Sequence, residues 1–202
     1  MKKILILTSF IFGIAYVTYA QSPVRIGGGG GGLAYNEGDK IIQVGLGLGR
    51  TIGGRYGYAY SGLGAAINGA VEIGIHEYFS VGPYVAFGRY SYNFNYGLGR
   101  NTYSTTAVAA GARGSFHYTS LFNEAFDTSI DEEKLDLYVA LLLGVQYNSY
   151  SYSGEGARGS SVFLDGGAVL GGRYKFTPGI AAFTELGYAS LSVWTVGVSF
   201  HL

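Results

Sequence analysis

The chain has 202 residues, of which 35 are glycine, 19 tyrosine and 12 phenylalanine, while 13% are charged and none is cysteine. An ordinary soluble domain carries about 25% charged residues and about 7% glycine, so the composition disfavours that class. The 13 basic and 13 acidic residues balance, which argues against a nucleic-acid partner. Without cysteine the chain forms neither disulfides nor thiolate metal sites.

Residues 1–20 have the features of a cleaved secretory signal peptide. A basic start precedes an apolar run from Ile4 to Val17, and Thr18 and Ala20 supply small residues before the expected cleavage point. The apolar run is shorter than the roughly 20 residues that span a membrane as a helix, so a retained anchor is the less favoured alternative.

Residues 21–40 read as a glycine-rich periplasmic linker. The six consecutive glycines Gly27–Gly32 are entropically costly to order, which favours a flexible segment. A phosphate-binding loop is disfavoured, because no Lys-Ser or Lys-Thr pair follows the glycines.

From residue 41 to the end, apolar residues alternate with small or polar residues, which is the period of a β-strand. The predicted strands are 41–51, 63–75, 79–92, 106–118, 135–147, 162–176, 180–188 and 193–202. The last strand has one apolar face and needs a closing partner, for which the first strand is the candidate. We therefore expect an all-β fold, an eight-stranded antiparallel transmembrane β-barrel with up-and-down meander topology, over residues 41–202.

The connections alternate in character. Tight turns follow the second and sixth strands, whereas tyrosine-rich loops at 52–62, 93–105 and 148–161 follow the first, third and fifth. Bacterial barrels have long extracellular loops and short periplasmic turns, so we expect these three loops outside and both termini in the periplasm. Their tyrosines read as an interfacial aromatic girdle, with an adhesive surface as the alternative.

One connector departs from this alternation. Residues 119–134 fall on the periplasmic side but are long, and their apolar residues recur at helical spacing, which predicts one short periplasmic helix. We interpret the connector as a cap over the barrel mouth, or as a docking segment for another periplasmic or secretion-system protein.

Three motifs near the C-terminus carry a resemblance to a known family: Gly172-Arg173-Tyr174, Glu185-Leu186-Gly187-Tyr188 and Val196–Phe200. They look like the last three strands of the PorT-like barrels of Bacteroidetes, and residues 41–202 resemble the small outer-membrane barrels of the OmpA/OmpX type. The resemblance implies a location in the cell outer membrane of a Gram-negative envelope, in contact with its lipid. It implies little about activity, because that group mixes structural, adhesive and secretion-linked members.

Five charged residues fall at inward-facing positions of the predicted strands. An eight-stranded lumen is just filled by side chains, so charges inside it must pair. We expect a structural network that plugs the lumen, with a proton or ion path as the alternative. The five residues are Glu72, Arg113, Asp136, Arg173 and Glu185.

The histidines argue against an enzyme. His76, His117 and His201 all fall near the periplasmic rim on this topology, whereas barrel enzymes that modify lipids work from the outer leaflet. A triad would have to use His117 with Ser115 or Asp136, at the wrong end. The sequence therefore predicts no catalytic, cofactor or metal site.

The expected function is a structural or interaction role in the outer membrane. An accessory subunit of an outer-membrane secretion or assembly machine, working through residues 119–134, is the alternative. A narrow pore for small or hydrophobic solutes is a second alternative.

Overall fold

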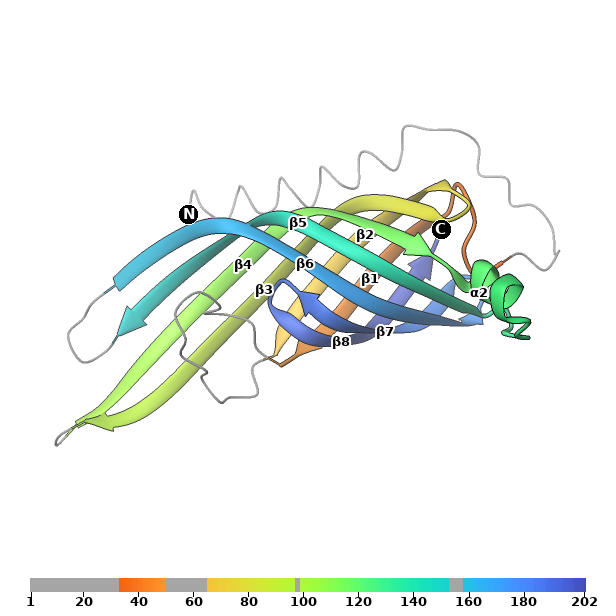
Figure 1. Cartoon of the computed structure of the whole chain (residues 1–202). Helices are drawn as coiled ribbons and strands as arrows, with labels where there is room; N and C mark the ends of the chain where they lie inside the picture. Colours follow the sequence, from red (N-terminus) through yellow and green to blue (C-terminus); the bar gives the residue numbers. More distant parts are fainter. Residues whose placement is uncertain (1–32, 50–64, 97–98, 153–157) are drawn as a thin grey trace. The chain divides into compact units, whose positions relative to one another are not determined.

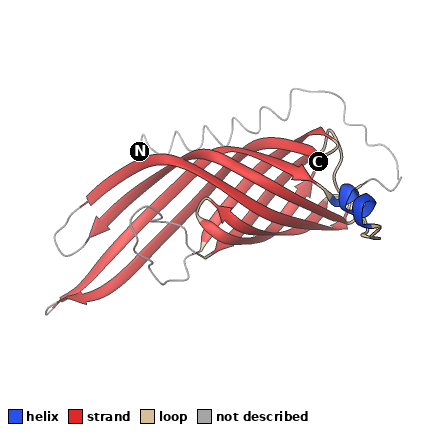
Figure 2. Cartoon of the chain, in the orientation of Figure 1, coloured by secondary structure: helices blue, strands red, loops and turns tan. Residues whose placement is uncertain are grey.

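The computed structural model describes residues 33–49, 65–96, 99–152 and 158–202, which form a closed antiparallel β-barrel. Eight strands follow one another around the barrel in sequence order (Figures 1 and 2). Their bounds are β1 (Lys40–Leu48), β2 (Ala66–His76), β3 (Phe79–Tyr96), β4 (Gly99–His117), β5 (Leu135–Tyr152), β6 (Arg158–Thr177), β7 (Ile180–Ala189) and β8 (Ser192–His201). The predicted meander is confirmed. The signal peptide, the linker up to residue 32 and the loop at 52–62 lie outside the described residues.

The last strand closes the barrel on the first, as the sequence predicts. In this antiparallel pairing Ile42 lies opposite Phe200, and Leu46 lies opposite Val196. Side chains that face each other across a strand pair lie on the same side of the sheet, so these apolar residues form one continuous outer surface. The barrel therefore has no open edge between β8 and β1.

The barrel is apolar outside and small or polar inside. Along β5, Leu141 and Leu143 expose 64% and 69% of their surface, whereas Ala140 and Leu142, which alternate with them, are at most 8% exposed. Soluble proteins bury such residues, and outward bands of them belong to barrels surrounded by lipid. The large apolar residues that are more than half exposed include Leu46, Ile67, Ile75, Leu141, Leu143, Val162, Leu164, Leu170, Phe176 and Leu186.

Four neighbouring strands are much longer than the rest. Strands β3 to β6 have 18 to 20 residues, whereas the other four have 9 to 11. In Figure 1 the β3–β4 and β5–β6 hairpins reach past the other strands at one end, which we call the hairpin end. The opposite end carries the helix and the C-terminus, and we call it the α2 end.

The prediction of loops at 93–105 and 148–161 is wrong for most of their length. They continue as strands, so that β3 ends at Tyr96 and β5 ends at Tyr152. Both faces of these extensions are polar or aromatic, so they lack the apolar alternation that marks a strand in sequence. Tyrosine and threonine nonetheless favour strands, and Tyr103 lies directly opposite Tyr152 in the β4–β5 ladder.

The predicted short helix is present as α2 (Thr119–Phe126), which follows β4. It ends at Asp127, which adopts a left-handed conformation with φ of 50°. No helix in the described part of the chain is long and apolar enough to cross a membrane.

Candidate functional site

The structure brings the five sequence-predicted charged residues together in the lumen. Each of them is at most 4% exposed. Arg113 lies between two carboxylates, with its Nε 3.2 Å from Glu72 Oε1 and its Nη2 2.7 Å from Glu185 Oε1. Arg173 Nη1 lies 2.7 Å from Asp136 Oδ2, and its Nη2 lies 3.5 Å from Glu72 Oε1. Glu72 therefore links the two arginines into one network.

Tyr138 is the aromatic centre of this network. Its ring is fully buried, its hydroxyl donates to Glu185 Oε1 at 2.8 Å, and the guanidinium groups of Arg113 and Arg173 lie 5.4 and 4.9 Å from the ring centroid. The ring fits because β6 has a glycine beside it: a Cβ on Gly171 would lie 2.2 Å from Tyr138 Cε2. Inward-facing glycines such as Gly171 thus make room for large side chains in the lumen. The two guanidinium groups are stabilised by their position over the aromatic ring.

His117 joins the network at the α2 end. Its Nδ1 lies 2.8 Å from Asp136 Oδ1, and its Nε2 lies 3.0 Å from Ser80 Oγ. The Ser80 hydroxyl donates its one proton to Glu72 Oε2, at 2.5 Å, so its oxygen is left to accept from His117. Both ring nitrogens of His117 therefore have a hydrogen-bond partner in the network.

Ser80, His117 and Asp136 have the spacing of a nucleophile, base and carboxylate, but the Ser80 hydroxyl donates to a different partner. A catalytic serine gives its proton to the histidine, whereas the Ser80 proton is held by Glu72. Ser80 is also only 1% exposed. The expected alternative partner, Ser115, instead accepts from Arg113 Nε at 3.2 Å.

A segment before β1 covers this network at the α2 end. We call residues Leu33–Asp39 the N-terminal strap. Tyr35 is 5% exposed, and its hydroxyl donates to the backbone carbonyls of His76 and Phe79, at 2.9 and 2.5 Å. The Tyr35 ring also stacks on the His117 ring. The sequence pattern predicts that these residues belong to the 21–40 linker, whereas the structure places them against the interior of the barrel at the α2 end.

Backbone hydrogen bonds hold the strap to β2. Gly38 N donates to Gly74 O at 3.0 Å, and Gly74 N donates to Asp39 O at 2.8 Å. A Cβ on Gly74 would lie 2.6 Å from the carbonyl oxygen of Asn36. The strap can lie this close to β2 because residue 74 has no side chain.

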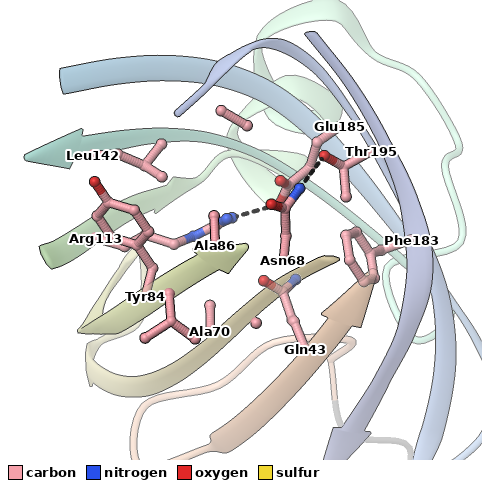
Figure 3. A pocket seen from close by; sticks show the side chains of 13 residues that line it. Gln43, Asn68, Ala70, Tyr84, Ala86, Arg113, Leu142, Phe183, Glu185 and Thr195 are labelled. Atoms are coloured by element: carbon pink, nitrogen blue, oxygen red, sulfur yellow. Dashed lines mark hydrogen bonds and ion pairs between the residues drawn. The ribbon is translucent and has the colours of Figure 1, made fainter. Parts of the chain in front are cut away.

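Residues of the β7–β8 turn lie in the hairpin-end half of the lumen. The turn between β7 and β8 folds inward, so that Ser190 and Leu191 are at most 1% exposed, and the Tyr90 hydroxyl donates to Leu191 O at 3.4 Å. Figure 3 shows the cavity left beside this turn, with Arg113 directed at Glu185 and Asn68 at Thr195. Its volume is about 30 Å³, the share of roughly one water molecule.

A larger cavity of about 180 Å³ lies at the α2 end, next to the charge network. Two tyrosines, Tyr35 and Tyr78, form part of its wall. Two carboxylates, Glu77 and Glu132, also line it, and His117 and Asp136 lie among the remaining lining residues. Among the described residues, no group of three or more His, Cys, Asp or Glu side chains is placed to hold a metal ion.

Sequence reasoning missed Tyr35, Ser80 and Gln43 as members of the site. Ser80 and Gln43 occupy inward positions of their strands, so strand alternation could have identified them. With its amide oriented to satisfy its neighbours, Gln43 donates to Glu72 Oε1 at 3.0 Å and accepts from Arg173 Nη2 at 2.7 Å. Tyr35 lies outside any periodic segment, and no sequence signal marks it.

No family model matches this chain, and no curated protein matches its sequence. Among solved structures, the chain is similar to the attachment invasion locus protein Ail of Yersinia pestis, solved with the heparin analogue sucrose octasulfate. The TM-score is 0.53 at 17% identity, over 82% of this chain and 99% of that chain. The N-terminal β-barrel domain of Pseudomonas aeruginosa OprF gives 0.45 at 11% identity, over 83% and 100%. A de novo designed transmembrane β-barrel gives 0.44 at 14% identity, over 83% and 98%.

Proposed function

We propose that this chain is an integral protein of the cell outer membrane with a closed lumen, no catalytic role, and a structural or interaction function in the envelope. The observation that carries the proposal is the distribution of side chains. Leucines and other large apolar residues cover the outside of the barrel, while the interior holds paired charges. The fold shared with Ail, an outer-membrane barrel, agrees with this location.

Two protein segments support the closed lumen. The N-terminal strap covers the α2 end, and the inward β7–β8 turn fills the space near the hairpin end. The interior cavity between them has room for about one water molecule. This arrangement disfavours a narrow pore, so planar bilayers containing the folded protein should show no stepwise conductance.

The extended sheet supports an interaction role outside the cell, with the α2 end in the periplasm. Residues 158–167 of β6 pair with β5 on one side, and within the described ranges no strand pairs with them on the other. A strand edge without a pairing partner is a template for an added strand.

An accessory role in a secretion or assembly machine is the second candidate. It is favoured by two exposed phenylalanines on α2, Phe122 and Phe126, whose ring centroids lie 4.7 Å apart. Exposed aromatic pairs on a short helix mark a contact surface for another protein. The three C-terminal motifs resemble those of PorT-like barrels, a group with secretion-linked members. We propose that the chain is related to that group, which would favour the machine-subunit role.

A pull-down of the tagged protein from its native envelope in mild detergent separates these roles. Recovery of the barrel alone supports a free-standing envelope protein. Stoichiometric recovery of periplasmic proteins, lost when residues 121–130 are deleted, supports the machine subunit instead. A strain that lacks the protein should keep the parental lipid A and phospholipid composition, and a change in either would contradict the non-catalytic role.

A further inference from the structure

We propose that the cavity at the α2 end is a binding site for an organic cation, namely an alkylguanidinium or alkylammonium group. The cavity borders the lumen network at His117 and Asp136 and has a volume of about 180 Å³, the share of roughly six water molecules. That space suits the head of an arginine or lysine side chain, or a small free amine. The proposal holds whichever envelope role the barrel has.

The first argument is a carboxylate that is held in place but carries no ion pair. Glu132 Oε1 accepts from Asn123 Nδ2 at 2.6 Å, and Glu132 Oε2 accepts from Ser120 Oγ at 2.9 Å. Both donors lie on α2 and fix the orientation of the carboxylate. Two further acceptor positions remain on its oxygens. Among the described residues no cation lies within ion-pair distance of Glu132, so a preorganised acceptor faces the cavity.

The second argument is the electrostatic field at the cavity wall. The pKa of the Tyr78 hydroxyl is raised, first by the charge of Glu77 and then by burial and by the charges of Glu124 and Glu132. These carboxylates come from three elements, the β2–β3 turn, α2 and the connector after it. Two of them, Glu77 and Glu132, line the cavity, where a positive charge is stabilised.

The third argument is the aromatic content of the wall. Tyr35 and Tyr78 both line the cavity, and the faces of such rings attract guanidinium and ammonium groups. Acidic and aromatic groups together select an organic cation over a compact metal ion, which requires several oxygen ligands at short distance. The connector from 119 to 134 carries five acidic residues and one lysine, which attracts cations towards the site.

The test uses the full chain, folded in zwitterionic detergent, and calorimetric titration with n-propylguanidinium chloride. Saturable binding is expected, and the nearly isosteric neutral n-propylurea should not bind over the same range. Glu132→Gln should weaken binding about tenfold, because one charge-assisted contact is lost. The matched control Glu133→Gln, one residue along and outside the cavity, should bind within about twofold of wild type. If Glu132→Gln fails to fold, Glu77→Gln replaces it.

A second titration separates the two sources of the cation. The peptide acetyl-Gly-Arg-Gly-amide binds at least ten times more tightly than n-propylguanidinium if the ligand is a side chain of a protein partner. Equal affinities indicate a free small cation, and both results support the site. Equal binding of n-propylurea, equal effects of the two glutamate variants, or no saturable binding by folded wild type overturns the proposal.

Discussion

The phenol ring of Tyr35 lies flat on the imidazole ring of His117, with ring centroids 3.5 Å apart and an angle of 5° between the planes. Tyr35 precedes the first strand, whereas His117 is the last residue of β4. The stack therefore ties the N-terminal strap to the buried charge network. Stacked rings at this spacing stabilise each other beyond the burial of their surfaces.

Replacement of Tyr35 tests the contribution of the strap to stability. Tyr35→Ala should lower the free energy of unfolding by about 3 kcal/mol, because a large buried ring and its packing are lost. Leu33→Ala is the control, since Leu33 is 41% exposed and should change stability by less than about 1 kcal/mol. Urea unfolding in lipid vesicles, followed by gel mobility, measures both. Equal effects would mean that the strap does not stabilise the barrel.

Removal of a buried cation tests the network. Arg113→Met leaves Glu72 and Glu185 without one of their partners and should cost roughly 3 to 5 kcal/mol of unfolding free energy. Lys134→Met breaks the exposed Asp131–Lys134 pair, whose side chains are about half exposed, and should lower the unfolding free energy far less than Arg113→Met does. The same urea titration compares the two variants. A cost for Arg113→Met as small as that for Lys134→Met would contradict the pairing.

Two glycines of β4 give a matched test of strand approach. A Cβ on Gly111 would lie 2.2 Å from Leu143 O and 2.5 Å from Gly144 Cα, whereas a Cβ on Gly114 would have no atom within 4 Å. Gly111→Ala should therefore destabilise the barrel by about 1 to 3 kcal/mol. Gly114→Ala should be neutral or slightly stabilising, because alanine restricts the unfolded chain. A higher urea unfolding midpoint for Gly111→Ala than for Gly114→Ala would refute this packing.

A charge on the outer surface tests the lipid-facing belt. Leu141→Arg places a guanidinium on an outward position that is 64% exposed, and should cost about 2 to 4 kcal/mol in a bilayer. Ser151→Arg, on the exposed hairpin-end extension of the same strand, should cost less than about 1 kcal/mol. The difference should appear in lipid vesicles. Identical stabilities of the two variants would place Leu141 outside the hydrocarbon.

Strand alternation explains why so much of the fold is predictable from sequence. A shift of one residue would turn every side chain of a strand to the other face, so the apolar pattern alone determines which residues face the lumen. Glu72, Arg113 and Asp136 were assigned to the lumen on that basis, and all are buried there. The helical spacing of apolar residues likewise predicts α2.

The features that sequence reasoning missed depend on long-range contacts. The contact of Ser80 with His117 joins residues 37 positions apart and depends on the register between β3 and β4. Tyr35 makes its hydrogen bonds to residues more than 40 positions away, from a segment without periodicity. The hairpin extensions lack an apolar face, so their strands are not visible as alternation. A pattern within one segment cannot reveal contacts of these kinds.

The most direct test of an integral membrane barrel uses its single tryptophan. Trp194 lies on the outer face of β8, is 45% exposed, and donates from its indole nitrogen to Thr184 Oγ1 at 2.9 Å. The protein is refolded into vesicles with and without bromine on the lipid chains, and tryptophan fluorescence is measured. We expect strong quenching by the brominated lipid while gel mobility reports a folded barrel. Unquenched, water-exposed emission from the folded protein would contradict insertion in the membrane.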